Sequence, residues 1–194
     1  MTKYSLAFLF FLATVMCAGC SQQSAYINPD EPDELGGAGI DSQEIRTVSD
    51  NMARDLVGSP ALTGASKKPI IALLPVKNET HFRIDADIIN LRIRNALIKF
   101  SDRATFVQRE RIEDIRAERA AKRAGDVSSS GEQMVSGADY FLTGTIKELS
   151  KSAKGKEANY TYFSFELIDA ESSNVVWAND YEVKKVAERG VLYR

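Results

Sequence analysis

The sequence contains few of the side chains on which enzymes most often depend. It has two cysteines and one histidine, His81, among 194 residues. Nucleophilic triads need a histidine beside the nucleophile, and zinc sites need several cysteine or histidine ligands. The Gly-x-x-x-x-Gly-Lys-Ser/Thr phosphate loop is also absent. We therefore predict a protein that is not an enzyme, with no catalytic residue, no metal site and no cofactor. Chemistry by paired carboxylates is the alternative that these counts leave open.

An excess of positive charge is also lacking. The chain has 25 basic and 27 acidic side chains, and its formal net charge is −2. A domain that binds nucleic acid usually carries a clear basic patch or stripe. The most charged stretch, residues 108–124, contains several arginines, but acidic residues alternate with them, which is typical of a solvated helix. We therefore expect no nucleic-acid partner.

A long apolar run occurs only at the N-terminus. Leu6–Val15 is apolar but shorter than the roughly 20 residues that a membrane-spanning helix needs. Lys3 precedes this run, and the small residues Ala18-Gly19 follow it directly before Cys20. The arrangement resembles the bacterial lipobox, which implies cleavage before Cys20 and acylation of that cysteine. The alternative is an ordinary secretory signal in which Cys20 has no role.

These features divide the chain into a signal peptide (residues 1–19), a lipidated cysteine with a linker (20–40) and a folded domain (41–194). The linker is rich in proline, glycine and acidic residues, a composition that predicts disorder. A fully extended linker of about 20 residues would span about 70 Å. We interpret it as a leash that sets the reach of a membrane-anchored domain; a passive spacer is the alternative.

The first half of the folded domain alternates between helical and strand patterns. Apolar residues recur at helical spacing from Ser42 to about Val57, and Asp41 or Ser42 can cap this helix. The apolar run Ile70–Val76 predicts a central strand, and a second helix is predicted from a cap at Asp85 to about Phe100. The apolar face expected for this helix is Ile88, Ile89, Leu91, Ile93, Ala96, Leu97 and Phe100. A short strand over residues 104–108 completes a β-α-β unit.

The C-terminal third predicts three strands, over residues 138–149, 159–168 and 175–184, with turn residues between them. In the middle strand Thr161, Phe163, Phe165 and Leu167 alternate with more polar side chains, so we expect these four on the buried face. The predicted fold class is α/β: a single small domain with a mixed sheet of about five strands, flanking helices and a C-terminal antiparallel meander.

The loop after the first strand is the candidate for partner binding. It places His81, Phe82 and Arg83 in a polar segment, and loops at strand ends often carry binding groups. The alternative is a capped turn in which Asn78 and Thr80 satisfy the backbone of their own loop.

Three segments, residues 75–80, 138–146 and 169–177, resemble the LpoB family of penicillin-binding-protein activators. The resemblance implies a monomeric lipoprotein of the outer membrane, facing the periplasm, whose LpoB-like domain binds and activates a class A penicillin-binding protein. Ser21 directly after the lipidated cysteine also resembles the outer-membrane class of lipoproteins. Related domains of the Tol and curli-secretion systems share features of these segments, so the alternative is a structural or secretion-system envelope lipoprotein. Oligomeric state would separate the two, because such a component would assemble into rings or filaments.

Overall fold

The computed structural model of the chain describes residues 26–29, 31, 37–107, 120 and 137–188. The predicted signal peptide and Cys20 lie outside the described residues. The predicted charged helix over residues 108–124 does so too, apart from residue 120.

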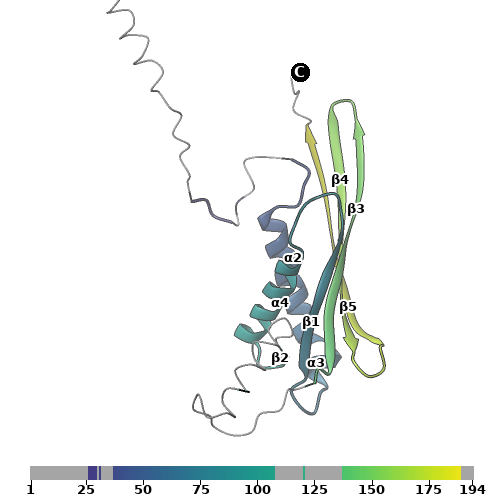
Figure 1. Ribbon diagram of the computed structural model, residues 1–194. Helices are drawn as coiled ribbons and strands as arrows, with labels where there is room; N and C mark the ends of the chain where they lie inside the picture. Colours follow the sequence, from purple (N-terminus) through teal and green to yellow (C-terminus); the bar gives the residue numbers. More distant parts are fainter. Residues whose placement is uncertain (1–25, 30, 32–36, 108–119, 121–136, 189–194) are drawn as a thin grey trace, which may run out of the picture.

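A mixed five-stranded sheet forms the centre of the domain, in the order β2-β1-β3-β4-β5 (Figure 1). Strand β1 pairs in parallel with β2 and β3, and β3, β4 and β5 form an antiparallel meander. The α/β fold class predicted from the sequence is therefore confirmed. The elements are α2 (Ser42–Gly58), α3 (Pro60–Thr63), β1 (Ile70–Glu79), α4 (Asp87–Phe100), β2 (Thr105–Val107), β3 (Tyr140–Ala153), β4 (Lys156–Asp169) and β5 (Val175–Glu188).

Helix α2 begins as predicted. The Asp41 side chain accepts a hydrogen bond from the backbone N–H of Glu44, and the Glu44 side chain accepts one from the backbone N–H of Asp41. This reciprocal capping box satisfies two N–H groups that a bare helix end would leave unpaired. Short helix α3 was not predicted, although Pro60 at its first position is a common helix start.

Helix α4 begins later than predicted, and its apolar face is narrower. Its N-cap is Ala86, while the Asp85 carboxylate accepts a hydrogen bond from the N–H of Asp87. Ile89, Ile93 and Leu97 are buried, but Ile88 and Leu91, which share the apolar pattern, are exposed. A helix packed on one side of a sheet buries only one stripe, so consecutive apolar residues such as Ile88 and Ile89 cannot both face the core.

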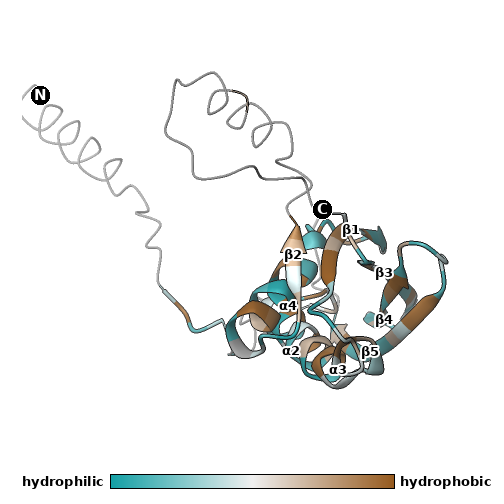
Figure 2. Ribbon diagram, turned by 90° about the horizontal axis from the view of Figure 1, so that it is seen from below, coloured by the Kyte–Doolittle hydropathy of each residue, from teal (hydrophilic) through white to brown (hydrophobic). Residues whose placement is uncertain are grey.

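The core lies between the helices and one face of the sheet, called here the inner face. Figure 2 shows α2 and α4 on the same, concave side of the strands. Phe163, Phe165 and Leu167 of β4 are fully buried and Thr161 nearly so, as the alternation predicts. Each large apolar side chain removed from water in this way stabilises the fold by about 1.5–3 kcal/mol.

The opposite, outer face of the sheet has no helix over it within the described residues (Figure 1). Strands β3 and β4 also extend beyond the helical layer to form a long hairpin. They are longer than predicted because Lys154 and Gly155, both at positive φ, close a two-residue turn to which strand pairing continues. At the end of this hairpin β4 pairs with β5, but β3 beyond Lys147 has no second strand partner among the described residues. The outer face of the hairpin is open.

Candidate functional site

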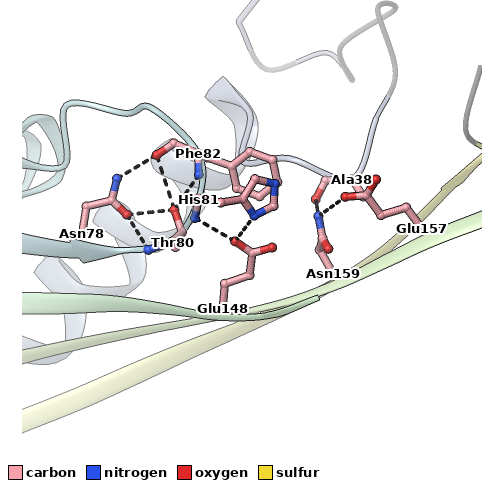
Figure 3. Close-up of polar contacts among 8 residues, drawn as sticks. All are labelled: Ala38, Asn78, Thr80, His81, Phe82, Glu148, Glu157 and Asn159. Carbon is pink, nitrogen blue, oxygen red and sulfur yellow. Dashed lines mark hydrogen bonds and ion pairs between the residues drawn. The ribbon is translucent and has the colours of Figure 1, made fainter. Parts of the chain in front are cut away.

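The loop that joins β1 to α4 is a capped turn at the inner side of the hairpin (Figure 3). Asn78 Oδ1 accepts hydrogen bonds from the N–H and the hydroxyl of Thr80, at 3.0 and 2.8 Å. Asn78 Nδ2 donates to the carbonyl of Phe82 at 2.9 Å, and the N–H of Phe82 donates to Thr80 Oγ1. Asn78 and Thr80 thus satisfy the loop backbone, as the capped-turn interpretation predicts. The turn fixes where the three candidate residues lie.

His81 is joined to the β3 strand. Its Nδ1 lies 2.7 Å from Glu148 Oε2, and its backbone N–H donates to the same oxygen at 3.2 Å. The His81 side chain is 56% exposed, whereas that of Glu148 is only 5% exposed. Glu148 Oε1 is buried and has no hydrogen-bond partner in the described structure. The buried carboxylate therefore depends on His81 for its polar contacts, which orients the loop against the hairpin.

Phe82 and Arg83 have different surroundings. The Phe82 ring is half-buried, 4.0 Å from the His81 ring between centroids, and a Cβ added to Gly39 would lie 3.0 Å from it. Arg83 is exposed, and no ion pair or hydrogen bond joins it to any described residue. Of the three predicted contact residues, His81 and Arg83 are therefore exposed, and Phe82 is half-buried against the backbone of Gly39.

The backbone against which Phe82 packs belongs to the end of the linker, residues 37–41, called here the lead-in segment. Asn159 Nδ2 of β4 donates to the carbonyl of Ala38 at 3.1 Å. Lys185 Nζ of β5 donates to the carbonyl of Gly39 at 2.7 Å and to an Asp41 oxygen at 2.9 Å. Ala38 is buried, so residues before the predicted boundary at position 41 contact the domain.

Charges strengthen this connection. Lys185 Nζ also lies 2.9 Å from Glu44 Oε1. Burial lowers the pKa of Lys185, but the carboxylates of Glu44 and Asp41 outweigh it and raise the pKa above 10.5. Burial conversely raises the pKa of Asp41, while the Glu44 N–H and Lys185 together hold it below 3.8. Both groups are therefore charged at neutral pH, and the pair ties β5 to the start of α2.

Sequence reasoning did not identify Glu148, Asn159 or Lys185. Each lies at an inward position of a strand, where the alternation that predicts the core continues beyond the helices. Polar side chains at such positions indicate that something polar covers the strand there. Asn159 could have been recognised as such a residue from the sequence, because it lies two residues before Thr161 and therefore on the same face of the strand.

No set of three or more histidine, cysteine, aspartate or glutamate side chains that could hold a metal ion occurs within residues 37–107 and 137–188 or the few others described. No helix in the described part of the chain is long and apolar enough to cross a membrane.

The profile of the family described as "Peptidoglycan-synthase activator LpoB" matches residues 44–183, well over half of the chain. The chain belongs to the LpoB family. A search of curated proteins finds no match.

The solved structures that match this chain include C-terminal domains of LpoB. The C-terminal domain of LpoB from Salmonella enterica shares 13% identity, with a TM-score of 0.44, and the match covers 73% of this chain and 99% of that one. The corresponding domain from Escherichia coli shares 15% identity, with a TM-score of 0.43 and the same coverage. The PelC dodecamer from Paraburkholderia phytofirmans shares 16% identity, covering 64% of this chain and 75% of that one, at a TM-score of 0.31.

The segments that carry the LpoB resemblance have structural roles. Asp139 Oδ2 accepts a hydrogen bond from the N–H of Ile70 at 2.7 Å, which joins the starts of β3 and β1. Asp169 closes the β4–β5 turn, and the N–H of Ser172 lowers its pKa below 3.8. Trp177 Nε1 donates to Asp55 of α2 at 2.6 Å. These residues hold the sheet and helices in place, so the LpoB motifs report the fold more than a contact surface.

Proposed function

We propose that the chain is an outer-membrane lipoprotein whose periplasmic domain binds a class A penicillin-binding protein and activates its peptidoglycan synthesis. The observation that supports this most is the LpoB family profile, which spans the domain from α2 to Val183 of β5. The family is described as one of synthase activators, which supports the proposal of a regulatory rather than a catalytic role. The particular class of synthase and the anchor are proposed from the sequence.

The anchor is assigned to Cys20. One acyl chain binds a membrane only marginally, whereas two or more hold a protein stably. A lipobox-like ending before Cys20 provides the site for such chains. The linker then lets the domain reach away from the membrane toward a synthase, and Ser21 supports the outer membrane as the place of anchoring.

The loop of His81, Phe82 and Arg83 is proposed as one surface that contacts the synthase. His81 and Arg83 are exposed, and arginine is a frequent anchor at protein interfaces. Phe82 packs against the lead-in segment, so its part is to keep the loop in shape. The Glu148 carboxylate fixes the His81 ring from below. The loop would therefore meet a partner with little loss of conformational freedom.

Activation without catalysis requires that the domain bind one conformation of the synthase more tightly than another. The size of the effect is bounded by that difference, and about 1.4 kcal/mol corresponds to a tenfold shift. A monomer at the end of a free linker suits this mechanism, because each anchored chain can then act on one synthase independently.

Crosslinking in cells, followed by affinity purification and mass spectrometry, tests this function. We expect a class A penicillin-binding protein among the crosslinked partners. Recovery of only further copies of the chain, or of secretion-channel components, would instead favour a structural lipoprotein.

The loop is tested separately by titrating the synthase. Phe82→Ala with Arg83→Ala should weaken binding at least about tenfold. Of the two single variants, Arg83→Ala should carry the loss of affinity, and Phe82→Ala should lower the melting temperature. Unchanged affinity in Arg83→Ala would exclude the loop as a contact while leaving the function intact.

A further inference from the structure

The open, outer face of the hairpin end presents a regular set of side chains. Strand register places nine residues there in three cross-strand rows, each with one residue from β3, β4 and β5. We call this set the hairpin patch. Its rows are Leu149–Tyr160–Lys184, Lys151–Ala158–Val186 and Ala153–Lys156–Glu188.

The centre of the hairpin patch is apolar and exposed. Leu149 is 57% exposed and Val186 is 63% exposed, among the highest values for large apolar side chains in the described domain. Tyr160 and Ala158 lie between them in the two rows, so the four side chains form a continuous strip across three strands. Single exposed apolar residues are common, but a contiguous strip is typical of an interaction surface.

Lysines that lack partners surround this strip. Lys151, Lys156 and Lys184 form no ion pair or hydrogen bond with any residue that the structure describes, and neither does Lys154 at the turn. By contrast, Lys147 in the next row lies 3.7 Å from Glu79, and Lys185 on the inner face is paired with Asp41. Three lysines of the hairpin patch thus stand against one acid, Glu188, which lies opposite Lys156, so the net charge of the patch is positive.

The patch is also held rigidly from its inner side. Asn159 and Lys185, which alternate with the patch residues along β4 and β5, bind the lead-in segment. Glu148, next to Leu149, binds His81 of the loop. These contacts hold the inner side of an extended hairpin over which the described part of the chain places no helix, and a pre-ordered surface loses less entropy when it binds.

We propose that the hairpin patch is a docking surface for the synthase, and that the synthase surface it meets is acidic with an apolar recess. An apolar centre with a charged rim is the usual anatomy of a protein interface, and unpaired lysines at the rim select an acidic partner. The inference rests on the proposed function for the identity of the partner. The patch lies on the face opposite the inner side of the hairpin, where the loop of His81 and Arg83 packs, so separate substitutions distinguish the two contacts.

The test compares variants of the full chain, purified in detergent, in binding to a purified class A synthase. Leu149→Gln with Val186→Thr removes the apolar centre, and Lys151→Glu with Lys184→Glu reverses the rim. We expect each pair to weaken binding at least about tenfold. Ile98→Gln is the matched control, because Ile98 on α4 is 59% exposed, like Leu149, but lies outside the patch. It should change affinity less than about twofold.

Salt dependence provides a second readout that loss of folding would not give. Binding of the unchanged chain should weaken between about 0.05 and 0.5 M salt, and the charge-reversed variant should lose most of that dependence. Lys151→Gln with Lys184→Gln is a second variant for the case that the charge-reversed chain does not fold. It removes both charges without adding new ones, and we expect its affinity to lie between those of the unchanged and the charge-reversed chains.

The outcomes separate the patch from the function. Normal binding and stimulation by all patch variants would show that the hairpin patch is not a docking surface, while the proposed function would be unaffected. Failure of the unchanged chain to bind any class A synthase would overturn the function and this inference with it. If the same substitutions instead abolished binding to isolated peptidoglycan or to phosphatidylglycerol vesicles, with synthase binding intact, the protein partner would be wrong.

Discussion

Replacing Lys185 by methionine tests whether the lead-in segment is held to the domain by this one ammonium group. The Lys185 side chain reaches a carbonyl of the lead-in segment and the carboxylates of Asp41 and Glu44, all at 2.7–2.9 Å. Methionine keeps the aliphatic stem but donates no hydrogen bond. The two carboxylates, whose side chains are 16% and 13% exposed, would then lose their shared cation.

The expected loss of stability follows from this burial. Breaking a buried ion pair costs about 3–5 kcal/mol, whereas an exposed pair contributes at most about 1 kcal/mol. The Lys185 side chain is 27% exposed, and Asp41 and Glu44 keep the hydrogen bonds of the capping box. We therefore expect a loss of about 2 kcal/mol, which lowers the melting temperature of a domain of this size by about 4–8 °C.

Urea unfolding at neutral pH, followed by circular dichroism, measures this loss. Lys184→Met is the control, because Lys184 is the next residue on β5, points to the outer face and has no ion pair within the described residues. The control should change the unfolding free energy by less than about 0.5 kcal/mol. An equal effect of the two substitutions would show that the ion pair of Lys185 with Asp41 and Glu44 adds no stability.

The pH dependence gives an independent check. The pKa of Asp41 is lowered in the folded state, so its contribution is present above pH 3.8 and is lost as the pH falls through the lowered pKa. The pKa of Lys185 is raised, so its contribution is present below pH 10.5 and is lost as the pH rises through the raised pKa. The stability difference between the unchanged chain and Lys185→Met should thus be constant between these limits and shrink beyond them. A difference that does not change down to strong acid would contradict the ion pair.

Three further predictions concern packing, anchoring and the domain boundary. Gly144→Ala should lower the free energy of unfolding by about 3 kcal/mol, because the added Cβ would lie 2.6 Å from the Phe165 ring and 2.8 Å from a backbone oxygen. An unchanged melting temperature in calorimetry would count against this prediction. Cys20→Ala should leave the chain soluble or uncleaved, and finding it normally processed in the outer-membrane fraction would argue against the lipid anchor. A chain that begins at residue 37 should unfold at a higher urea concentration than one that begins at residue 41, since the lead-in segment contacts the hairpin. Equal midpoints would show that these contacts add no stability.

Most helices and strands of this fold could be predicted because each is specified by residues that are close together in the sequence. The alternation of Thr161, Phe163 and Phe165 specifies one buried face of a strand, and Asp41 with Glu44 specifies a helix start. Neither requires knowledge of distant parts of the chain. The apolar face predicted for α4 contained too many residues, because the sequence does not show that Ile89 faces the sheet and Ile88 faces solvent.

The contacts that build the site could not be predicted in this way. Lys185 meets residues 39, 41 and 44, and His81 meets Glu148, and each pair is far apart in the sequence. Such pairs depend on how β3, β4 and β5 extend past the helices, which follows from the turn at Lys154 and Gly155 and from the register. The hairpin patch likewise becomes visible only when the three strands are aligned. The amino-acid sequence alone does not show that Leu149 and Val186 lie in adjacent rows.

The central claim, that this LpoB-family domain activates a synthase without chemistry of its own, is tested most directly by the rate of glycan polymerisation. A purified class A penicillin-binding protein is supplied with lipid-linked precursor, and its rate is followed as the chain is added. We expect a saturable rise in rate, at concentrations that match the binding curve, and we expect Leu149→Gln with Val186→Thr to abolish this rise. A rate that stays constant while the chain is bound would contradict activation.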